Sequence, residues 1–307
     1  MNEEQGMETL SARRELLFLY DIRMGNPNGD PDENRPRQLP DGTFYVTDVR
    51  LKRFARDYLM QKGSDILVGS VEGRTTNLTG RVQAHLTKLG KKEAKGKELV
   101  NILLDSFIDA RLFGSSLAFK ASKDWKAEPE PKTLTGAVQI NHGEVLHAAE
   151  EIMIKGTSVF ASDEAKTQGT FTEYACLRYG LMGFSGVAKL HSARLSRMTN
   201  EDYETLLGAI WNGVRAAGNT RTKMGQSPRL LVDVRYKSGV EYQIGNLANY
   251  LDLRSSTKPD SRTWSSCFDY ELDVTRLLAK LDAVSDRIEV VRYDHESDLR
   301  IEPKELP

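Results

Sequence analysis

The order in which hydrophobic periodicity changes along the chain is the feature that most constrains its fold. Residues 15–24 place large apolar side chains at alternate positions, which predicts a strand whose second face is half polar. A Thr47-Asp48 cap then precedes apolar residues at helical spacing as far as Leu59, which predicts a helix. Segments with the same two periods predict the later elements: strands at 137–146, 174–190 and 229–236, and a helix at 199–214 that opens with a capping box.

In chain order these elements are β, α, insertion, β, insertion, β, α, β. This is the split βαβ, ferredoxin-like order, which also underlies the RNA-recognition module. We therefore predict an α+β fold, with one elaborated domain over residues 1–307 built on a ferredoxin-like (RRM-like) βαββαβ core. The predicted segments are a core at 13–62, 133–150 and 173–240, insertions at 63–132 and 151–172, and a C-terminal extension at 241–307. The glycine-rich strand at 179–187 lacks the aromatic signature of that module, so stacking of RNA on the sheet is not expected.

Charge is distributed unevenly along the chain. Of the 307 residues 39% are hydrophobic and 28% are charged, as in a folded soluble protein, and the net charge of −1 gives no sign of a nucleic-acid partner. Locally, however, 50–62, 88–97 and 221–237 each carry five basic residues and one acid, whereas the last 26 residues carry eight acids and four basic residues. Three separate basic patches on a nearly neutral protein favour a polyanionic partner.

The cysteines and the hydropathy pattern predict a cytoplasmic location. Cys176 and Cys267 lie far apart and match no paired metal or redox spacing, which favours a reducing compartment. The first residues lack the charged and apolar regions of a signal peptide, and no apolar run is long enough to cross a bilayer. We expect no membrane association.

The stretch MGNPNGDPDENRPRQ, after the first predicted strand, invites comparison with a calcium loop. Asn26, Asn28, Asp30 and Asp32 alternate as calcium ligands do. A calcium loop, however, needs glycine at its sixth position and glutamate at its twelfth, and counting from Asn26 those positions hold Pro31 and Arg37. We therefore predict no metal site, no cofactor, and a structural role for the two aspartates in turns and beside neighbouring arginines.

No set of residues for catalysis emerges. The five histidines are scattered without metal-ligand spacing, and neither a nucleophile elbow, a dinucleotide fingerprint nor a phosphate-binding P-loop occurs. What remains is a set of loops ordered by proline and glycine that carry arginine, lysine and asparagine near a sheet edge. Such groups bind phosphates and riboses without reading bases, which predicts RNA held by its backbone.

Four stretches, taken together, resemble a known family. NPNGDPDENRPR at 26–37, TDVRLKRFARDYL at 47–59, DARLFGSS at 109–116 and LTGAVQINHGEVLH at 134–147 are similar, in this order, to the backbone subunit of type I CRISPR surveillance complexes (Cascade). That subunit belongs to the RAMP superfamily, and the likeness is to the type I-B and I-C branch. It spans roughly residues 13–237 and implies a palm with a fingers insertion at 63–132 and a thumb insertion at 151–172.

The resemblance implies that several copies line up head to tail along one CRISPR RNA and leave its bases free to pair with target DNA. Other Cascade subunits would cap the filament ends, and a separate nuclease-helicase would be recruited. Carried over residue by residue, the expected RNA contacts are Asn28, Gly29, Asn34, Arg35, Lys52, Arg53, Arg111, Phe113, Gln139, Arg221 and Lys223. The lysine run of the fingers is expected to face target DNA through Lys88, Lys91, Lys92, Lys95 and Lys97.

Alternatives remain open at the level of residues and of function. Phe113 could be core, Arg111 could pair with Asp109, and Asn28-Gly29 could simply make a turn. An RNA endonuclease of the same superfamily, which processes precursor RNA, would need a clustered acid–base set. An unrelated metal- or nucleotide-binding enzyme is the third class. The DNA-targeting branch leaves cutting to another protein, so we predict no enzymatic activity.

Overall fold

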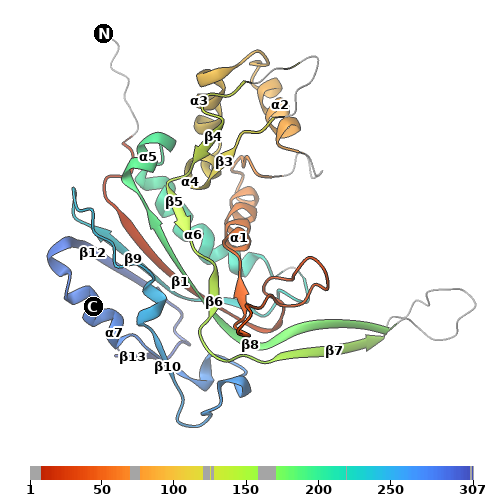
Figure 1. Ribbon diagram of the computed structural model, residues 1–307, viewed down its shortest axis with the longest axis vertical. Coiled ribbons are helices and arrows are strands. Elements are labelled where there is room, and N and C mark those ends of the chain that lie inside the picture. Colours follow the sequence, from red (N-terminus) through yellow and green to blue (C-terminus); the bar gives the residue numbers. More distant parts are fainter. Residues whose placement is uncertain are drawn as a thin grey trace, which may run out of the picture.

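The computed structural model describes residues 8–69, 77–119, 125, 128–157, 171–218, 220–304 and 306. Within them an antiparallel sheet of eight strands has the order β12-β9-β1-β8-β6-β2, with β5 and β7 also pairing with β8 (Figure 1). Its strands are β1 (Arg14–Gly25), β2 (Tyr45–Val46), β5 (Val138–Ile140), β6 (Gly143–Val145), β7 (Glu151–Thr157), β8 (Phe171–Ala188), β9 (Gln226–Tyr236) and β12 (Ile288–His295). Helices and antiparallel strands are thus mixed, and the predicted α+β class is confirmed.

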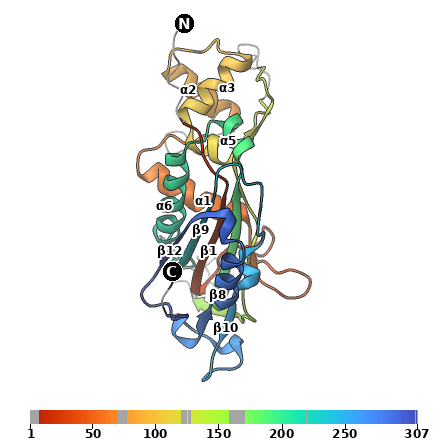
Figure 2. The same ribbon diagram turned by 90° about the vertical axis from the view of Figure 1, so that its left-hand side faces the viewer.

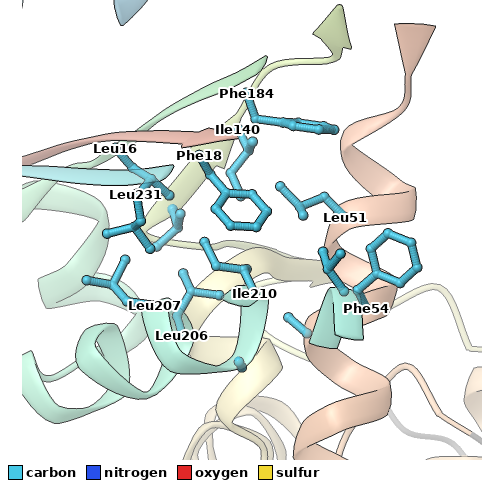
Figure 3. Packing of buried hydrophobic residues seen from close by; sticks show 14 of the residues in the cluster. Leu16, Phe18, Leu51, Phe54, Ile140, Phe184, Leu206, Leu207, Ile210 and Leu231 are labelled. Atoms are coloured by element: carbon cyan, nitrogen blue, oxygen red, sulfur yellow. The ribbon is translucent and has the colours of Figure 1, made fainter. Parts of the chain in front are cut away.

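Two long helices pack on one face of the sheet because each carries an apolar stripe. In α1 (Asp48–Gln61) Thr47 caps the first turn by accepting from the Arg50 backbone N–H, as the sequence predicts. In α6 (Asn200–Ala216) Thr199 forms the predicted capping box with Asp202. Figure 3 shows their leucine and isoleucine side chains interlocking with apolar residues of the sheet.

The second face of β1 is buried as well, which the sequence pattern did not indicate. Leu17 and Leu19 are fully buried under the C-terminal part of the chain. The face is half polar, as the sequence predicts, but its two polar residues differ. Asp21 accepts hydrogen bonds from Tyr179 and Arg229 and is buried, whereas Arg23 is exposed.

The C-terminal segment forms the layer that covers this face. It contains β10 (Asp252–Arg254), β11 (Glu271–Asp273), α7 (Thr275–Asp282), β13 (Ile301–Glu302) and single-turn 3-10 helices at Leu247–Tyr250, Ser261–Thr263, Cys267–Asp269 and Ser285–Arg287. Strands β10, β11 and β13 make a small sheet of their own, and β12 joins the edge of the main sheet. RNA cannot stack on a sheet face that a protein layer occupies, in agreement with the missing aromatic signature.

The strand predicted at 137–146 is divided in two. β5 and β6 both pair with β8, but the pairing register shifts by one residue between them. The chain between them bonds through Asn141, whose backbone N–H donates to the Ser185 carbonyl and whose side chain accepts from the Ser185 N–H. A Cβ on Gly143 would lie 2.3 Å from the Phe184 ring, so glycine is needed where the chain bends back onto the sheet.

The insertion at 63–132 has a hydrophobic core of its own and more regular structure than the sequence analysis expects. It holds α2 (Leu78–Lys88), α3 (Gly96–Ser106), α4 (Ile108–Phe113) and β3 (Gly114–Ser116), and β3 pairs with β4 (Thr133–Thr135), which follows the insertion. Helix α5 (Leu190–Ser196) contacts α4 and β4. Only the part near 99–112 was predicted as helical. The α2 helix was missed because its buried face has few large apolar residues and includes His85.

The described residues at the two ends of the insertion predicted at 151–172 form the base of a projecting β arm. β7 pairs with the first residues of β8, from Glu151↔Leu177 to Thr157↔Phe171. The arm extends away from the body of the molecule (Figure 1), and α1 and α6 lie on the other side of the sheet from the C-terminal layer (Figure 2). Among the described residues no helix is long and apolar enough to cross a membrane.

Candidate nucleic-acid interface

The loop after β1 is held rigid by its own polar side chains. The Asp30 carboxylate accepts from the backbone N–H groups of Asp32, Glu33 and Arg35, each at 2.8 Å. These hydrogen bonds, led by that of Glu33, lower the pKa of Asp30. Asp30 therefore closes a turn, the structural role that the sequence predicts for it.

Two further residues of this loop connect it to neighbouring elements. The Asn28 side-chain oxygen accepts from the backbone N–H and the hydroxyl of Thr47, both at 2.9 Å, and so joins the loop to the start of α1. Arg35 forms a bidentate ion pair with Glu151, with nitrogen–oxygen distances of 3.0 and 2.5 Å, and so joins the loop to the base of the β arm. Gly29 and Asn34 lie in the loop between Asn28 and Arg35. Asn34 is exposed and has a positive φ of 54°.

The helical spacing predicts that Lys52, Arg53 and Arg56 lie together on the side of α1 away from the core, but the three cations have different environments. Lys52 is mostly covered and pairs with Asp48 at 2.7 Å, whereas Arg53 is 56% exposed and pairs with Asp57 at 2.7 Å. Arg56 is buried, so the prediction that it lies on the outer side is wrong. Its guanidinium neutralises the buried Asp109 carboxylate at 2.9 Å.

Asp109 explains why Arg56 turns inward. Besides Arg56, its two oxygens accept from the backbone N–H groups of Leu67 and Val68, so this carboxylate anchors the beginning of the insertion at 63–132. A buried carboxylate needs a cationic partner, and Arg56 supplies it. The alternative that Asp109 pairs with Arg111 is also wrong, because Arg111 bonds elsewhere.

Arg111 acts between elements of the fold. Its guanidinium binds both oxygens of Asp202, at 2.8 and 2.6 Å, and donates to the Leu104 carbonyl at 2.6 Å. Asp202 belongs to the capping box of α6, so Arg111 ties α4 to the start of that helix. Phe113 is half-buried, and its ring faces the cationic groups of Lys52 and Arg56 at 5.6 and 5.0 Å.

A basic hollow of about 660 Å³ opens between α1 and the end of α6. The hollow is lined by Arg50, Arg53, Asp57, Tyr58, Met60, Gln61, Gly213, Ala216, Ala217, Thr220 and Lys223. Two of the predicted RNA contacts, Arg53 and Lys223, meet here although they are far apart in sequence. Three basic side chains against one carboxylate give the lining of the hollow an excess of basic groups.

Lys223 is a partly buried basic residue of the hollow. Its ammonium donates to the Asn26 carbonyl, and burial together with the nearby Arg50 guanidinium lowers its pKa to about 7. Arg50 itself lies over the Phe54 ring at 4.4 Å. Sequence reasoning missed Arg50, although it precedes Arg53 by one helical turn and therefore shares its face.

The loop at 220–225 carries the other predicted contact of this region. The Thr222 carbonyl accepts from the Asn26 backbone N–H, which places the loop against the end of β1. Arg221 is exposed and stacks on the Tyr174 ring at 4.1 Å, next to the β arm. An arginine over an aromatic ring keeps its N–H groups available to phosphate.

Gln139 and the finger lysines lie apart from the hollow. Gln139 pairs with Val187 on β8, whereas the end of β1 pairs with Leu177 on the same strand. Val187 and Leu177 are ten residues apart, so Gln139 lies roughly 33 Å along the sheet from the end of β1. There it lines a smaller hollow of about 290 Å³. In the described residues no ion pair engages the exposed lysines of the fingers, which are Lys88, Lys91, Lys92, Lys95 and Lys97.

The histidines have roles in the fold. His142 accepts from the Asp48 backbone N–H at 3.2 Å, near the start of α1. His147 is enclosed by Tyr179 and Trp264, and burial lowers its pKa to about 4. In the part of the chain that the structure describes, no three His, Cys, Asp or Glu side chains gather closely enough to hold a metal ion.

Comparison with known proteins identifies the family. A family model described as CRISPR-associated protein Cas7 matches residues 12–275. CRISPR-associated protein Cas7 of Haloferax volcanii is 35% identical over 313 residues, which cover 96% of this chain and 90% of that protein.

Solved structures show a likeness of fold. Chains described as CRISPR RNA-guided surveillance complex and as CRISPR RNA-guided surveillance complex, pre-nicking, each superpose with a TM-score of 0.50. The first is 15% identical in sequence to this chain and the second 12%. Each match covers 94% of this chain, and it covers 94% of the first matched chain and 95% of the second. The resemblance seen in the four sequence stretches is thus confirmed over nearly the whole chain, and the protein belongs to the Cas7 family of CRISPR-associated proteins.

Proposed function

We propose that this chain is a non-catalytic backbone subunit that binds CRISPR RNA, polymerises along it in a type I Cascade complex and presents it for pairing with target DNA. The basic hollow between α1 and the 220–225 loop is the observation that carries this proposal. It sets Arg50, Arg53 and Lys223 around one space against the single acid Asp57. Family membership supports the same function.

The proposal assigns a role to each part of the fold. The strands β9, β1, β8 and β6, with α1 and α6 on one face, are a ferredoxin-like palm, whose four core strands would lie in the order 4-1-3-2. Residues 63–132 are the fingers, 151–172 the thumb and 241–307 an extension that covers the back of the palm. The whole chain acts as one elaborated domain.

We propose the following roles for the expected RNA contacts and for Arg50. Arg53, Lys223, Arg221 and the added Arg50 grip phosphates around the hollow. The backbone and side chains of the rigid loop, Asn28, Gly29 and Asn34, line its approach, and Arg35 exchanges Glu151 for a phosphate. Lys52, Phe113 and Gln139 extend the path toward the fingers, whereas Arg111 holds the palm together and does not contact RNA.

The partners follow from this arrangement. Copies of the chain associate head to tail, other Cascade subunits close the ends of the filament, and a separate nuclease-helicase is recruited to the complex. The finger lysines Lys88, Lys91, Lys92, Lys95 and Lys97 contact target DNA. The assembly works in the cytoplasm.

A pair of matched variants tests the hollow. Arg53→Glu reverses a helical arginine that is 56% exposed and paired with an aspartate. Arg276→Glu is the control, because Arg276 is a 59% exposed arginine on α7 that also pairs with an aspartate. Measured against salt concentration, Arg53→Glu lowers the slope of log affinity by about 0.7 for each phosphate that the side chain no longer binds, regardless of RNA sequence. Equal slopes in the two variants would remove Arg53 from the site.

A cleavage assay tests the non-catalytic part. Purified protein is incubated with end-labelled precursor RNA, with and without magnesium, and the products are separated on a denaturing gel. The proposal predicts intact RNA in both conditions. RNA fragments that appear with the folded protein but not with the same protein after denaturation would support an RNA endonuclease instead.

A further inference from the structure

Lys223 lines the hollow between α1 and the end of α6 without an acidic partner. Its side chain is partly buried, and its ammonium donates to the Asn26 backbone carbonyl. In the described part of the chain no carboxylate forms an ion pair with it, and the charged neighbour that acts on it is the Arg50 guanidinium. A lysine that is desolvated and placed beside another cation is poorly stabilised in its charged form. The Lys223 amine is therefore a candidate nucleophile.

The uncharged amine is the commoner form of Lys223 slightly above neutral pH. Burial and the nearby Arg50 guanidinium lower its pKa to about 7. At pH 7.5 roughly three-quarters of such amines carry no charge, whereas only about one ordinary lysine in a thousand is uncharged. The uncharged amine alone has the lone pair that attacks a carbonyl carbon. Lys223 thus differs in reactivity from a lysine on the open surface.

The hollow keeps a positive charge even when this amine is neutral. The other charged residues of its lining are Arg50, Arg53 and Asp57, two cations against one anion. Asp57 accepts from Nε of Arg53 at 2.7 Å, which leaves the two terminal amino groups of that guanidinium for another acceptor. Arg50 forms no ion pair with a carboxylate of the described residues, and its guanidinium lies over the Phe54 ring at 4.4 Å. Guanidinium groups of this kind bind phosphate oxygens.

The hollow also has room for a small phosphorylated molecule beside the amine. Its volume is about 660 Å³. The wall on the side of α6 is made of Gly213, Ala216 and Ala217, whose side chains are no larger than a methyl group. Lys223 and the two arginines border this one space, so an anion that the arginines bind shares the space with the amine.

We propose that Lys223 is an acylation site and that its reagents are acyl phosphates, small metabolites in which an acyl group is joined to phosphate. Arg50 and Arg53 bind the phosphate and hold the acyl carbon beside the amine. The lone pair of the amine attacks this carbon, and a nitrogen–carbon bond forms. The bond from the carbon to the bridging oxygen breaks with its electron pair on oxygen. The phosphate that leaves takes up the proton that the nitrogen loses, so the products are an amide and hydrogen phosphate.

Acylation removes a basic group from the hollow. An amide nitrogen takes up no proton near neutral pH, so the acylated hollow retains Arg50 and Arg53 against Asp57. RNA then binds more weakly, with one ionic contact fewer and a smaller dependence on salt. This effect on RNA rests on the proposed function, whereas the reaction of the amine does not.

The test uses the full chain without RNA, incubated with acetyl phosphate at pH 7.5. Peptide mass spectrometry gives the rate of acetylation at each lysine. Lys237 is the internal control, because it is an exposed lysine that also donates to a backbone carbonyl, that of Asp286 at 2.7 Å. A less basic amine is also a weaker nucleophile, so part of the advantage in uncharged amine is lost. We expect Lys223 to react at least about tenfold faster than Lys237.

Three further arms test the role of the arginines. An excess of inorganic phosphate should slow acetylation at Lys223 but not at Lys237. A neutral acetyl thioester, which lacks the phosphate, should show a smaller preference for Lys223. Arg50→Gln should lower the rate at Lys223 about tenfold, because a phosphate-binding group and the charge beside the amine are both lost. Arg276→Gln changes an exposed arginine of α7 and should leave that rate unchanged.

The outcomes separate this inference from the proposed function. Equal rates at Lys223 and Lys237 would overturn the acylation site, and so would a rate at Lys223 that inorganic phosphate does not lower. The second result needs no variant, so it holds even where Arg50→Gln does not fold. Selective acetylation of Lys223 that leaves RNA affinity unchanged would support the acylation site and contradict the proposed RNA contact. RNA binding without selective acetylation would contradict the acylation site alone.

Discussion

Binding of RNA in the hollow is expected to take up a proton at Lys223. In the RNA-free protein the pKa of this lysine is about 7, so its ammonium is largely deprotonated above neutral pH. A phosphate favours the charged form and raises the pKa toward the ordinary value of about 10.4. Because the bound state holds more protons than the free state, affinity falls as pH rises through 7. Between pH 6 and pH 9 the decrease is about a hundredfold for each hollow that RNA fills.

The assay is fluorescence anisotropy of a short labelled RNA at constant ionic strength across this pH range. The other charged groups that line the hollow, Arg50, Arg53 and Asp57, are left unchanged by a substitution at Lys223. Lys223→Arg is the control. An arginine stays charged over this pH range, so the RNA affinity of the variant should vary little with pH. The reasoning would be refuted by wild-type and Lys223→Arg curves with the same pH dependence.

Four further variants separate structural from binding roles. Arg111→Ala leaves the Asp202 carboxylate buried without its cation and should lower the free energy of unfolding by about 3–5 kcal/mol in denaturant titrations, without changing the RNA affinity of the folded fraction. Gly213→Ala places a Cβ 2.5 Å from the Phe54 carbonyl and should cost about 1–3 kcal/mol, whereas Gly208→Ala on the same helix meets no atom of another element within 4 Å and should be neutral or stabilising. Joint reversal of Lys91 and Lys92 to glutamate should weaken capture of target DNA in gel-shift assays but leave guide-RNA affinity intact; equal losses for both would contradict the assignment of the fingers to DNA.

The central strands and helices could be predicted because their periodicity is long and their caps are local. The Thr47 and Thr199 caps each act within three residues of themselves, so the sequence displays the whole interaction. That the C-terminal segment covers the second face of β1 could not be predicted in the same way. Leu17 and Leu19 share a face with Asp21, and only the folded chain shows that Tyr179 and Arg229 neutralise this acid inside the protein.

Only part of the candidate site could be predicted, and the reason is related. Arg53 and Arg221 are exposed, as their polar surroundings in sequence suggest. Arg56 and Arg111 have the same chemistry but are neutralised by carboxylates 53 and 91 residues away, Asp109 and Asp202. A long-range ion pair leaves no local pattern, so a basic residue on a helix can be assigned to a surface only after its partner is known.

Assembly along the guide is the central claim, and the most direct measurement is the mass of the complex as a function of RNA length. Purified chain is mixed with guide RNAs of increasing length, and light scattering after size exclusion gives the mass of each complex. We expect the mass of the complex to rise by the mass of one chain for each fixed increment of RNA length. Arg53→Glu should weaken the binding of every added chain alike. A mass that stays constant while the RNA is lengthened would contradict a backbone subunit.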